Sequence, residues 1–220
     1  MTPKTKTLTA TAVFFCLAVL FFIPAAVPCK LVFPVASLFV ASLWLNPWQI
    51  CAALAFSALG DWFGTTGRFI PQVCAFAVAH IFYIWFFVKR YLTKVEHDRK
   101  LTAKAKGYII MLMVCLAGLM TAVFSRIIPA APAGVDRIGV GIYAVLILAM
   151  LVMAMLQRST LYAIGGLLFV FSDFILAWNR FVEPVPYATY IIMLSYYLGQ
   201  WFLFVRSTPY RIASLRPFRF

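Results

Sequence analysis

The sequence has 220 residues, of which 65% are hydrophobic and 11% charged, with a mean hydropathy of +0.96 and a formal net charge of +13. Soluble globular domains are much less apolar, so the composition excludes them. Apolar runs of about 17 to 25 residues recur along the chain, each long enough to cross roughly 30 Å of hydrocarbon as a helix. Such unbroken runs exclude a barrel of alternating strands. The sequence therefore predicts an all-α, polytopic membrane protein.

The positive charge lies between and beyond the apolar runs rather than on one folded face. We interpret it as a signal of membrane topology and expect no nucleic-acid partner. The five cysteines are odd in number and widely spaced, without a C-x-x-C pair, so neither a disulfide framework nor a zinc knuckle is predicted.

The first apolar run follows a basic start, which is typical of a cleavable signal peptide as well as of a first span. Its length near 20 residues favours a span. Short connections with Pro or Gly follow most later runs, as between antiparallel neighbours in one bundle. We expect residues 1–220 to form a single transmembrane domain with eight spans, at about 7–27, 31–46, 48–66, 69–88, 107–128, 137–156, 159–178 and 186–205.

One long polar loop, residues 89–106, carries seven Lys or Arg and two acidic residues. With eight spans and a cytoplasmic N-terminus, fourteen basic residues lie inside and five outside. The positive-inside rule therefore predicts that both termini are cytoplasmic. We interpret the basic loop and tail as anchors to anionic lipid rather than as a dedicated partner site.

Three ionisable side chains lie well inside predicted spans: Asp61, His80 and Asp173. Each costs at least a few kcal/mol in hydrocarbon, so each is a candidate functional residue. Counted from the outer helix ends at 1.5 Å per residue, all three lie about 8 to 17 Å deep. A single buried Asp is often structural, but this combination at matched depth is hard to explain as packing. The Gly165 and Gly166 pair before Asp173 permits close helix approach.

Other polar side chains repeat this depth. Ser57 lies one helical turn before Asp61, and Tyr83 lies about one turn after His80. We therefore expect one polar cavity, lined by five or six helices and open to the outer leaflet. Its other expected lining residues are Tyr143, Tyr190, Tyr197 and Gln200, with Lys30 at its mouth.

These residue types suit acid–base chemistry. Removal from water disfavours a charged carboxylate, so one aspartate could stay protonated while the other is ionised. A zinc or iron site is the competing chemistry, because one His and two Asp are possible ligands. With a single His inside the predicted spans, we expect no metal and no other cofactor. No G-x-S-x-G motif is present, so no serine has the setting of a nucleophile elbow.

Four stretches, FSALGDWFG, CAFAVAHIFYIWFF, GGLLFVFSDFILAWNRF and SYYLGQWFLF, are similar in order and spacing to the YhhN-like lysoplasmalogenase family of eight-span membrane proteins. CKLVFPVASL resembles the family's Lys-Pro entry to span 2, with the Pro displaced to position 34. The resemblance covers about residues 29–205. It implies hydrolysis of the vinyl-ether bond of a lysophospholipid, lysoplasmalogen, to a fatty aldehyde and a glycerophospho-base. By motif it implies roles for Ser57, Gly60, Asp61, His80, Tyr83, Ser172, Asp173, Tyr197 and Gln200.

The mechanism we expect uses both aspartates. One protonates the vinyl carbon and the other, ionised, stabilises an oxocarbenium-like transition state before water adds. We favour Asp173 as the acid and Asp61 as the charged partner, although the sequence permits the reverse. His80 and Tyr83 would orient the water, and basic side chains would hold the lipid phosphate. The expected substrate-binding residues are Lys30, Ser57, Arg68, Tyr143, Ser172, Arg180, Tyr190, Tyr197 and Gln200.

Other classes stay open. An intramembrane aspartyl protease also uses two carboxylates, but ALGD lacks the first Gly of G-x-G-D. A proton-coupled transporter or lipid carrier would use Asp61 and Asp173 to relay protons or bind a cation, though no convincing inverted repeat is visible. A structural or regulatory membrane protein would need neither proton relay nor cation binding. Among these classes we favour the enzyme. We expect it to lie in a bacterial inner membrane, in contact with membrane lipids.

Overall fold

The computed structural model describes residues 2–24, 29–95 and 103–214, and every regular element in these ranges is helical, as the sequence predicts. The centre of the basic loop and arginines 216 and 219 lie outside these ranges. A π-helix, η1 (Val123–Ile127), and the short α6 (Ile128–Ala130) follow α5 without a break. The long helices are α1 (Pro3–Phe22), α2 (Phe33–Leu45), α3 (Trp48–Thr65), α4 (Phe69–Val95), α5 (Ala103–Ala122), α7 (Val135–Leu156), α8 (Thr160–Phe181) and α9 (Ala188–Ser214).

Each long helix overlaps one predicted span, but the helices are not equally suited to cross a membrane. Within the described ranges, five of them are long and apolar enough to do so: α1, α4, α7, α8 and α9. α2 is apolar but has only 13 residues. α4 and α9 have 27 residues each and continue past the predicted ends of their spans at 88 and 205. No Pro or Gly follows residue 88 closely, so α4 extends into polar sequence. α9 continues past its predicted end although Pro209 lies within it.

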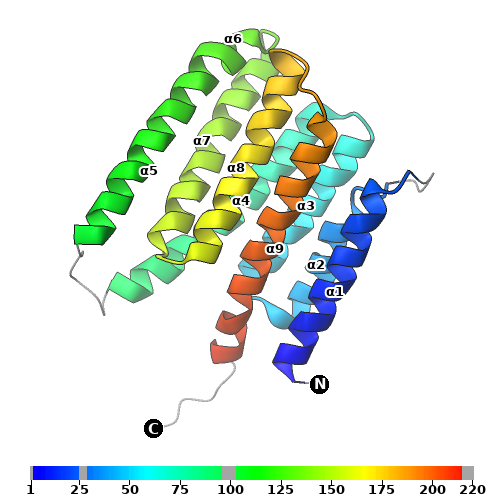
Figure 1. Ribbon diagram of the computed structural model, residues 1–220, viewed down its shortest axis with the longest axis vertical. Helices are drawn as coiled ribbons and strands as arrows, with labels where there is room; N and C mark the ends of the chain where they lie inside the picture. The colour runs from blue at the N-terminus through cyan, green and yellow to red at the C-terminus, as the bar shows by residue number, and fades with distance from the viewer. Residues whose placement is uncertain (1, 25–28, 96–102, 215–220) are drawn as a thin grey trace.

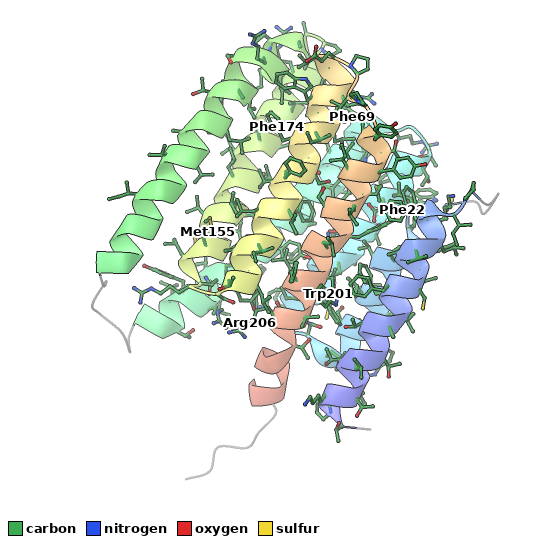
Figure 2. All side chains as sticks on the ribbon, in the orientation of Figure 1. Phe22, Phe69, Met155, Phe174, Trp201 and Arg206 are labelled. Carbon is green, nitrogen blue, oxygen red and sulfur yellow. The ribbon has the colours of Figure 1, made fainter. Side chains whose placement is uncertain are left out.

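Six helices form a closed ring, in which contacts run from α2 to α3, α4, α7, α8 and α9 and back to α2. α1 packs outside the ring against α2 and α9, whereas α5 runs along the opposite edge of the bundle (Figure 1). The start of α1 and the end of α9 lie at one end of the bundle, and α6 lies at the other (Figure 1). Figure 2 shows Phe174 toward the α6 end, with Met155 and Arg206 toward the opposite end.

The π-helix has a local cause. Pro129 has no N–H to donate to the carbonyl of Ser125, and its ring would clash with that carbonyl in a regular α-helix. The Ile128 N–H instead bonds to the Val123 carbonyl, five residues back. The wider π-helical turn directs the Val123 and Ile127 side chains toward the core, where both are buried.

Glycines allow α8 and α9 to pack unusually closely. A Cβ atom on Gly199 would lie 3.0 Å from the Gly165 carbonyl oxygen, and one on Gly165 would lie 3.1 Å from the Gly199 carbonyl oxygen. On the other side of α8, a Cβ on Gly166 would lie 3.1 Å from a methyl group of Leu151 in α7. The close approach expected at Gly165 and Gly166 is therefore present, and it brings polar residues of α8 and α9 into the ring.

Candidate active site

One polar cluster joins α4, α7 and α8. The Tyr143 hydroxyl of α7 donates a short hydrogen bond to Oδ2 of Asp173 in α8. The same hydroxyl lies 3.0 Å from Nε2 of His80 in α4. His80 is fully buried, whereas Tyr143 and Asp173 are partly buried. The structure therefore links three of the predicted site residues in a single chain.

Proton counting limits the states of this chain. A tyrosine hydroxyl has one proton, so when Tyr143 donates to Asp173, Nε2 of a neutral His80 must donate to Tyr143. In the reverse direction, a protonated Asp173 donates to Tyr143, which donates to His80. Nδ1 of His80 is buried and has no hydrogen-bond partner among the described residues. Nδ1 would be an acceptor in the first state and a donor in the second.

A second polar cluster joins α3, α4 and α9. Tyr196 donates to Oδ2 of Asp61 at 3.0 Å, and Asp61 is only 2% exposed. One turn after Tyr196, the Gln200 amide accepts from the Tyr83 hydroxyl at 2.6 Å and donates to the Ser57 hydroxyl at 3.0 Å. All of these side chains are buried, and each makes at least one hydrogen bond within the cluster.

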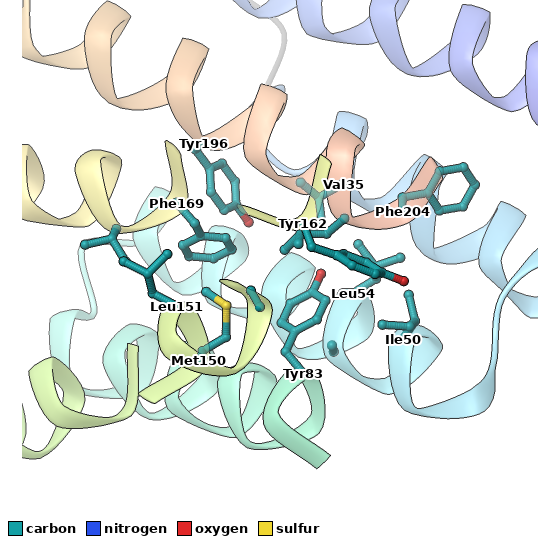
Figure 3. Close-up of a cluster of buried hydrophobic side chains, with 14 of the residues drawn as sticks. Val35, Ile50, Leu54, Tyr83, Met150, Leu151, Tyr162, Phe169, Tyr196 and Phe204 are labelled. Atoms are coloured by element: carbon teal, nitrogen blue, oxygen red, sulfur yellow. The ribbon is translucent and has the colours of Figure 1, made fainter. Parts of the chain in front are cut away.

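Aromatic rings lie between the two clusters. The Phe169 ring centroid lies 4.8 Å from that of His80 and 5.3 Å from that of Tyr196. Phe76 packs edge-on against both Phe169 and Tyr196. Figure 3 shows Phe169 beside Tyr196, within the hydrophobic core.

The sequence predicts that Asp61 faces Asp173 across one polar cavity, and this stays a prediction. No hydrogen bond connects the two carboxyl groups in the described part of the chain; each has a tyrosine partner of its own. Gly60 explains part of the arrangement, because a Cβ atom at that position would lie 3.0 Å from the ring of Phe76. The missing side chain therefore admits an aromatic ring close to Asp61.

A pocket opens beside Asp173, between α5, η1, α7 and α8. Its cavity volume is about 50 Å³, and it is partly open to the outside. Tyr143 and Asp173 are its polar lining residues, and the others described are apolar. The Asp173 carboxyl group therefore lies at the wall of an apolar pocket, whereas Asp61 is enclosed. Over residues 2–24, 29–95 and 103–214, no group of three His, Cys, Asp or Glu side chains is placed to hold a metal ion.

We call the three basic residues expected at the cavity mouth the basic rim. They lie at or just beyond helix ends, at the α6 end of the bundle. Lys30 donates to the Ile23 carbonyl at 2.8 Å, Arg68 is exposed before α4, and Arg180 stacks on Phe69 at 4.1 Å. The helix bounds also place both clusters nearer this end, since Asp61 lies four residues before the end of α3.

Three other predicted residues lie apart from both clusters. Ser172 donates to the Ile192 carbonyl, and Tyr197 donates to the Leu31 carbonyl at 2.8 Å. Tyr190 is exposed and stacks on Phe22.

Sequence reasoning missed Tyr196, the hydrogen-bond partner of Asp61. The signal was available, because Tyr196 and Gln200 are four residues apart and so share a helical face. Phe76 was missed too, because nothing in an apolar run distinguishes a ring between polar clusters from ordinary core.

The long apolar helices, with carboxyl and imidazole groups buried between them, define a multi-pass integral membrane protein with a candidate acid–base site. Residues 5–208 match the model of the YhhN family, and the chain belongs to that family. The resemblance visible in the four sequence motifs is thereby confirmed.

Curated relatives are similar over part of their length. The chain is 29% identical to human lysoplasmalogenase TMEM86B over 152 residues, which cover 67% of this chain and 58% of that protein. It is 33% identical to TMEM86B of Sus scrofa over 69% of this chain and 60% of the relative. It is 30% identical to human lysoplasmalogenase TMEM86A over 69% of this chain and 62% of that relative. The chain thus spans about three fifths of these relatives. No solved structure matches it.

Proposed function

We propose that this chain is a membrane hydrolase that cleaves the vinyl-ether bond of lysoplasmalogen, or of a related lysolipid, to a fatty aldehyde and a glycerophospho-base. The observation that carries the proposal is the position of Asp173, a carboxyl group held by Tyr143 at the wall of an apolar pocket. Relatives that share about 30% of its residues are named lysoplasmalogenases, which supports the same substrate class.

In this mechanism Asp173 is the general acid. Tyr143 donates to Oδ2, so Oδ1 would carry the acidic proton. Transfer of that proton to the β-carbon of the vinyl ether converts the double bond to a single bond and gives an oxocarbenium ion. Water adds to the α-carbon and loses a proton to Asp173. The hemiacetal then releases the aldehyde and the glycerol hydroxyl, so one water molecule is consumed.

The remaining predicted residues support this step. Asp61, with Tyr196 donating to it, would be the ionised partner whose field stabilises the positive charge across the Phe169 ring. His80 would orient the attacking water through its free Nδ1. Tyr83 and Ser57 would position this region through Gln200 rather than contact the substrate.

The proposal extends to membrane placement. All eight long helices would cross a bacterial inner membrane as one domain, with the N-terminus and the C-terminus both in the cytoplasm. The basic rim would then lie at the outer surface, near both clusters, where it could hold the lipid phosphate. A single-chain amphiphile suits such a site, because its tail can stay among helices while its head group remains in water.

The test is aldehyde release from lysoplasmalogen by the purified protein in detergent, for the wild type and for Asp173→Asn and Asp61→Asn. We expect both variants to lose most activity, because each substitution keeps the shape and removes the acid or the charge. Tyr187→Phe is the control, since Tyr187 is 79% exposed and belongs to neither cluster. Full activity in both Asn variants would refute the mechanism. No aldehyde from the wild type, with proton-dependent solute flux in vesicles, would favour a transporter.

A further inference from the structure

The pocket beside Asp173 has walls on four elements. Leu119 comes from α5, Val123 and Ile127 from η1, Ala144 from α7 and Ala177 from α8. Along α7 the lining runs from residue 140 to 148, which is about 12 Å at 1.5 Å per residue. One leaflet of hydrocarbon is roughly 15 Å thick, so the pocket has nearly the length of a leaflet.

The position of α5 leaves this pocket next to the outside of the bundle. α5 lies outside the ring and makes its main contacts with η1, the element that follows it (Figure 1). Ile110 and Val114 of α5 are 64% and 67% exposed, as expected of a helix that faces lipid. A hydrocarbon chain can therefore reach the pocket from the bilayer without crossing water.

We propose that this pocket receives the hydrocarbon chain of a single-chain lysolipid and holds its first bonds against Asp173 and Tyr143. The inference rests on the proposed function and adds the subsite to it. A hydrocarbon chain fits because the lining beyond those two residues is apolar. A peptide or sugar would leave its polar groups without partners there, at a cost of several kcal/mol. Ala144 and Ala177 are the small residues of the wall, so they set its width.

Binding of a non-cleavable lipid tests the subsite separately from hydrolysis. Ala144→Phe and Ala177→Phe narrow the pocket from two different helices. Leu167→Phe is the matched control, because it enlarges a side chain on α8 that is 44% exposed and outside the pocket. The probe is a saturated alkyl-ether lysophosphocholine, bound to the purified full chain in lipid nanodiscs.

We expect each narrowing variant to bind the probe at least tenfold more weakly, because hydrophobic pockets discriminate even one methylene group by about 10- to 200-fold. The control should bind as the wild type does. Phe174→Ala widens the pocket and should raise the affinity for a methyl-branched alkyl chain relative to the straight one. Such a gain cannot come from misfolding. Unchanged straight-chain binding in both narrowed variants, with an unchanged branched-to-straight ratio, would overturn the proposal.

Aldehyde release, measured in parallel, separates this inference from the proposed function. Probe binding that is lost on narrowing, without cleavage of lysoplasmalogen by the wild type, would support the subsite and refute the hydrolysis. Cleavage and binding that are both unaffected by narrowing would support the hydrolysis and overturn the subsite. A wild type that neither binds nor cleaves would overturn both.

Discussion

Replacing Tyr143 with phenylalanine removes one oxygen atom from the chain that joins His80 to Asp173. The two rings of His80 and Tyr143 lie 5.4 Å apart, and a phenyl ring can keep that packing. What is lost is the hydroxyl that donates to Asp173 and lies 3.0 Å from His80 Nε2. Tyr143→Phe therefore separates the hydrogen bond from the shape of the site.

The size of the effect follows from the charge on Asp173. As the acid gives its proton to the substrate, Asp173 becomes a carboxylate, and the Tyr143 hydroxyl stabilises that charge more than the neutral acid. A hydrogen bond to a charged group contributes about 1.5 to 3 kcal/mol. Since about 1.4 kcal/mol corresponds to a factor of ten, the chemical step should slow on the order of 10- to 160-fold.

Aldehyde release from lysoplasmalogen, with kcat and KM measured separately, is the assay. We expect kcat to fall by that factor with little change in KM, because the bond strengthens in the transition state rather than on binding. Tyr187→Phe, which removes an exposed hydroxyl, should match the wild type. A kcat for Tyr143→Phe equal to that of the wild type would refute the role of Tyr143 in stabilising Asp173.

Three further substitutions test other contacts. Tyr196→Phe removes the donor to Asp61, and we expect kcat for aldehyde release to fall about tenfold or more; wild-type kcat would contradict a role for charged Asp61. Gly199→Ala places a methyl group 3.0 Å from the Gly165 carbonyl oxygen and should cost about 1 to 3 kcal/mol, seen as a lower Tm in detergent. Phe169→Ala should cost about 3 to 5 kcal/mol through the cavity it leaves; an unchanged Tm would show that the ring does not support the clusters.

Most of the helical architecture could be predicted because each span is a local property of the chain. A run of bilayer length must be helical to satisfy its backbone in hydrocarbon, so eight runs predict eight helices. Each run overlaps one helix in the described residues, and five of these helices are long and apolar enough to cross a membrane. Helix ends were less predictable, since α4 and α9 continue into polar sequence. The π-helix was missed, although Pro129, four residues after Ser125, was a visible cause.

The candidate site, like the fold, could be predicted only in part. The rise of a helix per residue is enough to predict similar depths for Asp61, His80 and Asp173. The seven-residue spacing of Tyr190 and Tyr197 did not identify the face that meets Asp61. In the structure Tyr190 is exposed and Tyr197 donates to a backbone carbonyl. Tyr196, next to Tyr197, is the residue that donates to the Asp61 carboxyl group.

Composition and spacing along one chain thus establish the membrane class, the helical segments and the polar groups that share a depth. They leave open which helix each carboxyl group meets, because that depends on how every helix is rotated about its own axis in the bundle. Packing between helices sets those rotations: the ring beside Gly60 and the close contact of Gly165 with Gly199 bring Phe76 and Phe169 between the clusters. The separate tyrosine partners of Asp61 and Asp173 are therefore a property of the assembled bundle.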